Sequence, residues 1–193
     1  MHTMQALQTA CSNCDNCFLH ETRTNLVFGV GNPHADLMFV GEGPGEQEDK
    51  QGKPFVGRAG KLLDTMLEIL YLNRNDIYIT NIVKCRPPKN RDPLNVEREA
   101  CRDWLDQQMQ IVQPKIVVCL GRIAATSLIR EDFKITREHG QWFDIDGVKY
   151  MALYHPAALL RDQNKLPETF VDLKELQHAI SELCPDLYHH ESL

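Results

Sequence analysis

The chain alternates short apolar segments with amphipathic ones, and this alternation limits the possible folds more than any other feature does. Apolar runs typical of buried strands cover residues 35–40, 76–80, 115–120 and 148–154. The apolar spacing of helices is found over residues 58–70, 96–112, 123–129 and 167–183. Strands that alternate with helices predict an α/β fold, a single three-layer domain with a mostly parallel four-stranded sheet and helices on both faces. Asp146-Gly147, just before the last strand, indicates a hairpin turn.

Length and composition set broader limits. A chain of 193 residues suits a single domain over 1–193, in which a knuckle at 11–17 packs on the body and 184–193 form a flexible tail. No apolar run is long enough to cross a membrane, and the first ten residues lack the pattern of a secretory signal. We therefore expect a cytoplasmic protein, and a monomer. The net charge of −6 disfavours nucleic acid as a partner, but a local basic face is compatible with it.

Three unusual segments directly follow predicted strands. Gly41-Glu42-Gly43-Pro44-Gly45 follows the first strand, Asn81 follows the second, and His155 follows the fourth. Each has an ordinary alternative, namely a surface turn, a turn residue and a structural histidine. Open α/β sheets bind ligands at the carboxyl ends of their strands, and these segments converge there. The sequence therefore predicts a ligand site at this edge of the sheet.

The residue types suggest which chemistry the site performs. The acidic residues of 42–49 would repel phosphate, and they suit a cationic centre or one attacked by water. Phe55, in a glycine-flanked loop, is either a core residue or a platform for a planar ligand. The amide of Asn81 can read the edge of a nucleobase, and His155 can donate to a developing anion.

Two apolar residues followed by arginine, Leu159-Leu160-Arg161, lie beyond His155. One leucine can wedge into a base stack while Arg161 holds a phosphate, and ordinary packing is the alternative. A second basic segment, residues 84–91, contains two lysines and two arginines. Together the two segments predict a surface that contacts DNA.

Four of the seven cysteines suggest a metal site. Cys14 and Cys17 form a C-x2-C knuckle, and Cys85 and Cys101 follow much later in the chain. A reducing compartment disfavours disulfides, and four thiolates can hold either zinc or an iron–sulfur cluster. Cys11 and Cys14 form a rival knuckle. A site that joins both halves would tie the N-terminal segment to the middle of the chain.

In their order along the chain these motifs resemble the family 4 uracil-DNA glycosylases, the iron–sulfur members of the uracil-DNA glycosylase superfamily. The resemblance is collinear over about residues 14–176 and rests on Cys14-x2-Cys17, residues 41–45, 52–57 and 80–88, Cys101 and residues 155–161. It implies excision of uracil from single- or double-stranded DNA by base flipping. It also implies a [4Fe–4S] cluster on Cys14, Cys17, Cys85 and Cys101.

The resemblance also implies roles for individual residues. Phe55 would stack on uracil, Asn81 would read its edge, and His155 would contact the leaving base. The positions that line the sugar side are Glu42, Gly43 and Glu48. The best-known branch of the superfamily has an aspartate where this chain has Gly43, so either glutamate can position the water, and Glu42 is preferred.

For DNA contacts, Leu159 falls at the intercalating position of the superfamily. We expect the other contacts from Lys84, Arg86, Asn90 and Arg161. A related cross-linking group has a basic insert where this chain has residues 87–93, so covalent capture of DNA is not expected. Two other functions compete with a glycosylase, namely a metal-stapled DNA-binding module without catalysis and a redox carrier.

Overall fold

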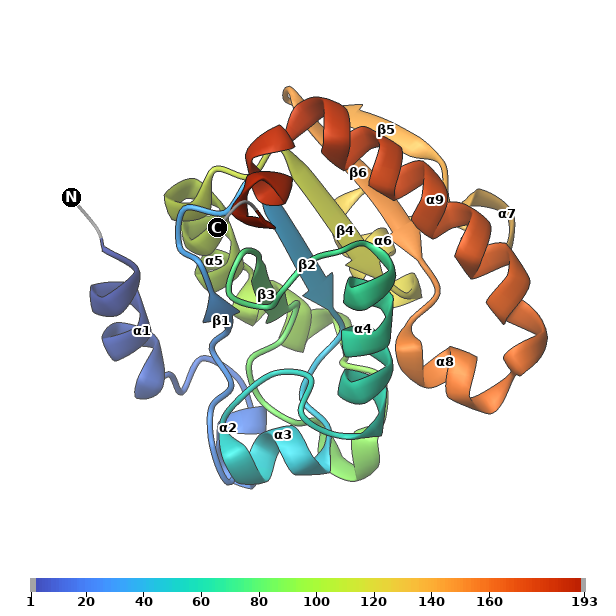
Figure 1. Cartoon of the computed structure of the whole chain (residues 1–193). Helices are drawn as coiled ribbons and strands as arrows, with labels where there is room; N and C mark the ends of the chain where they lie inside the picture. The colour runs from blue at the N-terminus through green and yellow to red at the C-terminus, as the bar shows by residue number, and fades with distance from the viewer. Residues whose placement is uncertain (1–2, 192–193) are drawn as a thin grey trace.

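The strands of the computed structural model, which describes residues 3–191, form one six-stranded mixed sheet in the order β1-β3-β2-β4-β6-β5 (Figure 1). The strands are β1 (Val30–Gly31), β2 (Leu37–Gly41), β3 (Tyr78–Asn81), β4 (Ile116–Leu120), β5 (Trp142–Ile145) and β6 (Val148–Leu153). The four predicted strands are β3, β2, β4 and β6, and they are parallel to one another. The predicted α/β class is thus confirmed, with two antiparallel edge strands added. The hairpin signal predicted β5, whereas β1 has only two residues and no pattern to detect.

The helices that cover the sheet have these bounds: α1 (Met4–Ser12), α2 (Leu19–Thr22), α3 (Glu46–Gln51), α4 (Arg58–Ile69), α5 (Asn95–Val112), α6 (Arg122–Leu128), α7 (Ile135–Glu138), α8 (Pro156–Arg161) and α9 (Leu166–Leu183). Short 3-10 helices lie at Pro88–Asn90, Gln163–Lys165 and Pro185–Glu191. The predicted helices correspond to α4, α5, α6 and α9. No helix among residues 3–191 is long and apolar enough to cross a membrane.

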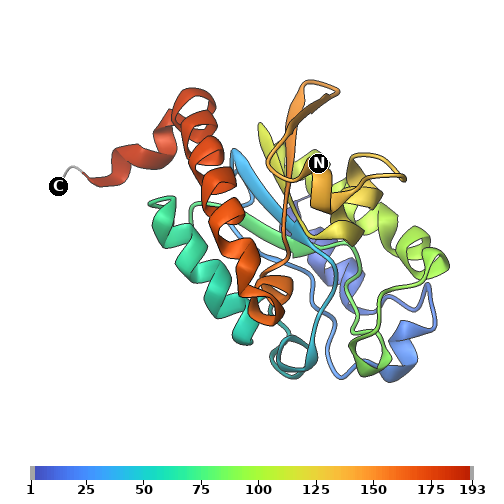
Figure 2. The ribbon, with the colours of Figure 1, turned by 90° about the vertical axis from the view of Figure 1, so that its right-hand side faces the viewer.

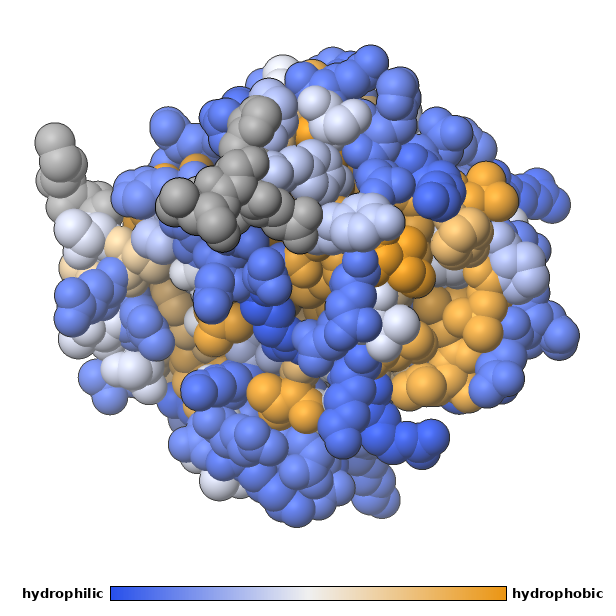
Figure 3. All heavy atoms as spheres, viewed as in Figure 1, coloured by the Kyte–Doolittle hydropathy of each residue, from blue (hydrophilic) through white to orange (hydrophobic). Residues whose placement is uncertain are grey.

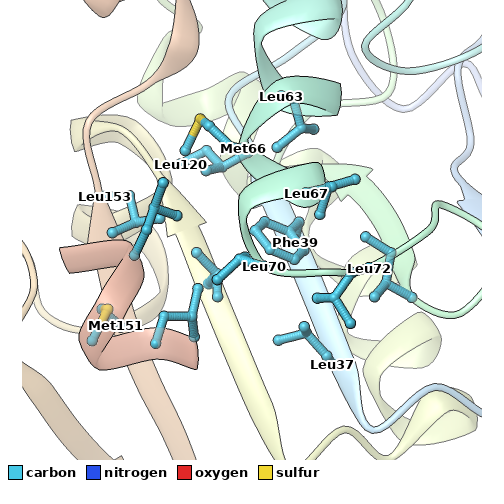
Figure 4. Packing of buried hydrophobic residues seen from close by; sticks show 14 of the residues in the cluster. Leu37, Phe39, Leu63, Met66, Leu67, Leu70, Leu72, Leu120, Met151 and Leu153 are labelled. Carbon is cyan, nitrogen blue, oxygen red and sulfur yellow. The ribbon is translucent and has the colours of Figure 1, made fainter. Parts of the chain in front are cut away.

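Alternate residues of the strands face two separate cores, which makes the fold three-layered. On one side, Phe39, Ile79 and Val118 pack with residues of α4 and α9. Figure 4 shows leucines of α4 meeting residues of β2, β4 and β6 in this core. On the other side, Met38 and Val117 pack with residues of α5 and α6. Figure 2 shows α4 and α9 together on one side of the sheet.

The first helix and the segment after α9 both pack on this body. Leu7 and Cys11 of α1 form a small core with Phe28, and Trp104 of α5 lies against it. At the other end Cys184 is fully buried, and Leu187 packs on the core beside α9. The flexible tail expected from residue 184 is therefore wrong for these residues, because apolar side chains anchor them. Residues 192–193 of that tail lie outside the described part of the chain.

The parallel strands bring the predicted site residues to one edge of the sheet. Gly41, the last residue of β2, pairs with Asn81, the last residue of β3. His155 follows β6, and its side chain lies against Gly121, which follows β4. Gly121 has a φ of 91°, and a Cβ there would lie 2.8 Å from His155 Cβ. Glycine at 121 therefore allows the loop after β6 to approach β4.

Candidate active site

A cavity of about 330 Å³ opens at the carboxyl ends of β2, β3 and β6. The residues that line it include Glu42, Gly43, Glu48, Phe55, Asn81, Asn90, Arg91, Asp92, His155 and Arg161. The structure thus brings together the predicted catalytic and base-binding residues, which come from four separate segments. Gly43 fits there because a side chain would collide with Val83, whose Cγ2 atom lies 2.7 Å from the position of a Cβ.

Asn81 and Phe55 both line the cavity, and their side chains meet beside Gly41. A Cβ on Gly41 would lie 2.5 Å from Asn81 Oδ1 and 2.6 Å from Phe55 Cζ. The Asn81 side chain is buried, and its Oδ1 atom has no hydrogen-bond partner among residues 3–191. Leaving a buried polar atom without a hydrogen bond costs free energy of folding. The position of this oxygen beside the cavity suits a hydrogen bond to a bound ligand.

His155 forms one wall of the cavity. Its ring stacks on that of Phe55, with 5.8 Å between centroids and 28° between planes. The backbone N–H of Ala157 donates to His155 Nδ1 at 3.0 Å, so a neutral ring carries its proton on Nε2. Burial, assisted by the charge of Arg161, lowers the pKa of His155 to about 4. The imidazole is therefore neutral at physiological pH and can donate from Nε2.

The two candidate glutamates have different environments. Glu48 Oε1 accepts hydrogen bonds from the backbone N–H groups of Val56 and Gly57 at 2.9 and 2.8 Å. Its carboxylate is thus committed to holding the loop beside Phe55. Burial, reinforced by Asp92, raises the pKa of Glu42 to about 7. A carboxyl that titrates near neutrality suits a general base better than one bound to backbone amides.

The four predicted metal ligands line a second pocket. Cys14 and Cys17 approach from the N-terminal segment, Cys85 from the loop after β3, and Cys101 from α5. Cys11 is fully buried but does not line this pocket. The structure therefore favours the Cys14/Cys17 knuckle over the Cys11/Cys14 rival.

Hydrogen-bond donors point at the sulfur atoms of this pocket. Trp104 Nε1 donates to Cys14 Sγ at 3.2 Å, and Arg23 Nη1 donates to Cys85 Sγ at 3.3 Å. The backbone N–H of Lys84 donates to Cys101 Sγ at 3.3 Å. Such donors stabilise thiolates and are common around metal–sulfur centres. Within residues 3–191, no three His, Cys, Asp or Glu side chains are close enough to hold a single metal ion.

Lys84 corrects one prediction, because it is fully buried and cannot contact DNA. Its Nζ donates to Thr80 Oγ1 at 2.6 Å, to the backbone carbonyl of Asn81 at 2.8 Å and to Gln108 Oε1 at 2.6 Å. Burial lowers the pKa of this ammonium to about 8. Lys84 therefore ties β3 to α5 inside the protein. The local cluster of basic residues in the sequence gave no sign that this one faces inward.

Leu159 corrects a second prediction. Residues 156–161 form the helix α8 rather than a loop, so adjacent leucines point in different directions. Leu159 is 1% exposed and belongs to the core beside α4, whereas Leu160 is 36% exposed. Figure 3 shows apolar surface over α8 and the start of α9. Pro156 at the first helical position was the available sequence signal for this helix.

Polar residues at the cavity rim come from the loop after β3 and from α8. Arg86 Nε donates to Asn90 Oδ1 at 2.7 Å, and exposed Arg161 ends α8. Arg91 binds Glu97 through both terminal nitrogens, at 2.9 and 2.6 Å. No local sequence pattern indicates this pair, whose two residues lie six positions apart across a loop. It holds the rim loop against α5.

The chain is similar to known proteins along most of its length. Residues 28–179 match the family model described as the uracil DNA glycosylase superfamily. A type-4 uracil-DNA glycosylase of Archaeoglobus fulgidus is 42% identical over 97% of this chain and 98% of its own length. A type-4 enzyme of Sulfurisphaera tokodaii is 45% identical over 91% of this chain and 86% of its own length. A type-4 enzyme of Thermotoga maritima is 43% identical over 92% of this chain and 93% of its own length.

Proposed function

The chain belongs to the uracil-DNA glycosylase superfamily, and we propose that it removes uracil from DNA by hydrolysing the N-glycosidic bond after base flipping. The observation that supports this most directly is the buried Asn81 side chain, whose Oδ1 atom has no hydrogen-bond partner within residues 3–191, beside the stacked rings of Phe55 and His155. The cavity is large enough for one base and opens at the surface. The reaction is therefore the first step of base excision repair.

Phe55 and Asn81 recognise the extruded base. Phe55 supplies a flat apolar face, which binds any base without distinguishing among them. Asn81 supplies the selectivity, because uracil presents a carbonyl and an N–H along one edge where cytosine presents an amine and an acceptor nitrogen. The carboxamide matches the uracil pattern with one donor and one acceptor. Extrusion costs a few kcal/mol, and it costs least for a mispaired or single-stranded base.

His155 and Glu42 act on opposite sides of the bond that breaks. As the bond to the sugar lengthens, negative charge develops on uracil and positive charge develops on the sugar. The neutral His155 donates a hydrogen bond from Nε2 to the departing uracil. Glu42, when ionised, orients the attacking water and stabilises the cationic sugar. Glu48 keeps the adjacent loop in place through Val56 and Gly57.

The four cysteines fit an iron–sulfur cluster better than a zinc ion. One zinc ion requires four ligand atoms within about 2.3 Å of a single point, whereas a cluster of several irons holds its thiolates farther apart. All four sulfurs line one pocket, yet no single-ion group is formed among residues 3–191. We therefore assign Cys14, Cys17, Cys85 and Cys101 as ligands of a [4Fe–4S] cluster. Bound there, it would serve as a cross-link, since hydrolysis transfers no electrons.

DNA contacts the rim of the cavity. Arg161 and Arg86 are placed to contact phosphates, and Asn90 lies on the same rim. Leu160 replaces Leu159 as the residue that fills the gap in the base stack, because it is the exposed leucine of α8. We also propose that the protein is cytoplasmic and monomeric.

Leu160→Ala should slow excision from a U:A duplex more than from single-stranded DNA. A single strand has no opposing stack that must be held open, so the wedge contributes little there. The matched control is Leu159→Ala, which removes the same atoms from a core position and should cost about 2–5 kcal/mol of stability. Single-turnover rates on both substrates provide the measurement. Equal slowing of both substrates by Leu160→Ala would show that the residue only packs the helix.

The proposed activity is tested with a labelled oligonucleotide that contains one uracil. Incubation followed by hot alkali should cleave the strand at that position, and an otherwise identical thymine oligonucleotide should remain intact. Binding to the uracil strand without cleavage would instead establish a DNA-binding module. A redox carrier would show neither cleavage nor a preference for uracil.

Asn81→Asp provides the internal control for this assay. An ionised aspartate has only acceptors, so it loses the donor that matches the uracil carbonyl. Uracil excision should fall while DNA affinity remains close to that of the parent. Normal excision by Asn81→Asp would show that this side chain does not read the base.

A further inference from the structure

Phe55 has a backbone conformation that its side chain disfavours. Its φ is 53°, in the left-handed region that non-glycine residues rarely adopt. This conformation directs the ring toward His155 and the cavity, where its relative exposure is 6%. Residues held in this way require other contacts that keep the backbone in place. The Phe55 carbonyl oxygen accepts such a contact from Arg74.

Arg74, in the loop between α4 and β3, binds the peptide segment that contains Phe55. Its Nη2 donates to the carbonyl oxygens of Phe55 at 2.6 Å and Gly60 at 3.1 Å. Its Nη1 donates to the Pro54 carbonyl at 3.3 Å. Its Nε donates to Asp64 Oδ1 at 2.5 Å, and the carboxylate fixes the orientation of the guanidinium.

The start of α4 closes tightly on the same carbonyl. A Cβ on Gly60 would lie 1.9 Å from the Phe55 oxygen, so only glycine allows this approach. One guanidinium therefore holds the loop and the first turn of α4 together. Arg74 does not line the cavity, so it can affect a bound base only through Phe55.

We infer that Arg74 is a positioning residue for base recognition: by binding the Pro54, Phe55 and Gly60 carbonyls, it keeps the Phe55 ring in the place where the extruded uracil stacks. This inference rests on the proposed function and adds a residue outside the cavity that positions the stacking platform. Only arginine has a rigid fork that binds three carbonyls and a carboxylate together. Lysine has a single ammonium and cannot reproduce the arrangement.

Arg74→Ala should lower kcat/KM for uracil excision by roughly fivefold to 30-fold, as expected when a left-handed residue loses its support. The inhibition constant of free uracil should rise by a similar factor, because free base tests the platform without any DNA contact. Affinity for uracil-free DNA should remain unchanged, since phosphate contacts lie elsewhere. Arg74→Lys should fall between the parent and Arg74→Ala.

A double-mutant cycle separates positioning from general stability. In a Phe55→Ala background, Arg74→Ala should cause little further loss, because the ring that it positions is already absent. The matched control is Arg102→Ala, which removes an exposed arginine bonded to Asp106 at 2.8 Å and to the Ser127 carbonyl at 3.0 Å. This control should leave kcat/KM and uracil inhibition unchanged.

The outcomes distinguish the inference from the proposed function. If the parent excises uracil and folded Arg74→Ala keeps its kcat/KM and its uracil inhibition constant, the inference is wrong. It is also wrong if the losses from Phe55→Ala and Arg74→Ala multiply. If Arg74→Ala does not fold, Arg74→Lys decides by the same readouts. A parent that neither excises nor binds uracil overturns the proposed function as well.

Discussion

Replacing His155 with alanine is expected to slow single-turnover uracil excision by on the order of 100- to 1000-fold, the usual cost of removing a donor aimed at developing negative charge. The neutral ring donates from Nε2 because Nδ1 accepts the Ala157 N–H. The hydrogen bond to uracil becomes stronger as the base leaves, so its loss raises the barrier more than it weakens binding. Excess-enzyme kinetics on a uracil oligonucleotide provide the measurement.

Two controls accompany this variant. DNA affinity, measured by fluorescence anisotropy, should remain close to that of the parent, because the proposed phosphate contacts are made by Arg86 and Arg161 and not by His155. His139→Ala removes another partly buried histidine, which is held by Asp172 and Glu168 away from the cavity. It should reduce stability without slowing excision per folded molecule. A parental rate in His155→Ala would refute the assigned role.

The pH dependence of excision should report Glu42 rather than His155. The pKa of Glu42 is raised to about 7 by burial, so kcat/KM should fall as the pH drops below that value and the carboxylate protonates. His155, with a pKa of about 4, stays neutral throughout this range. Glu42→Gln should be slower and should lose the acidic limb. If Glu42→Gln keeps the same fall in kcat/KM at acidic pH, another group is responsible for that pH dependence.

The same two groups affect folding stability with opposite signs. The pKa of Glu42 is higher in the folded state, so its contribution is present below pH 4.5 and is lost as the pH rises through about 7. The pKa of His155 is lower in the folded state, so its contribution is present above pH 6.5 and is lost as the pH falls toward 4. The pH ranges over which the two contributions change overlap. As the pH rises through this overlap, the contribution of Glu42 to stability is lost while that of His155 is gained. The rate profile therefore diagnoses Glu42 better than a melting curve.

Local patterns in the sequence were sufficient to predict the main strands and helices and the edge of the sheet where the cavity lies. Apolar runs become β2, β3, β4 and β6, and parallel strands bring Gly41, Asn81 and His155 to one edge. The direction of individual side chains required the structure. Lys84 lies in a basic segment but points between β3 and α5, and Leu159 rather than Leu160 is buried.

Contacts that depend on backbone conformation were equally absent from the sequence patterns. Phe55 gives no sign of its positive φ, and Arg74 follows it by nineteen residues without any motif. Glu42 and Glu48 both fitted an acidic loop, and only the hydrogen bonds to Val56 and Gly57 separate their roles. Tertiary contacts, which no local pattern encodes, decide these cases.

The second large effect is expected from Cys85→Ser, which should yield a colourless protein without bound iron and sulfide, whereas the parent should be brown. This substitution removes one of the four proposed thiolate ligands. The lost ligand lies where the loop after β3 meets the N-terminal segment. Arg23 spans the same junction through Cys85 Sγ and the Cys14 carbonyl, at 3.3 and 2.7 Å. The thermal midpoint of Cys85→Ser should therefore fall, because the cross-link between distant parts of the chain is lost.

Cys11→Ser is the matched control for this prediction, because Cys11 is a buried cysteine beside the pocket that does not line it. Its iron content should equal that of the parent even if its stability falls. Loss of iron in Cys11→Ser would show that the knuckle is Cys11/Cys14. One zinc ion per colourless parent molecule would overturn the cluster. If Cys85→Ser retains excision in proportion to its folded fraction, the cluster acts as a cross-link, since the proposed catalytic residues line the other cavity.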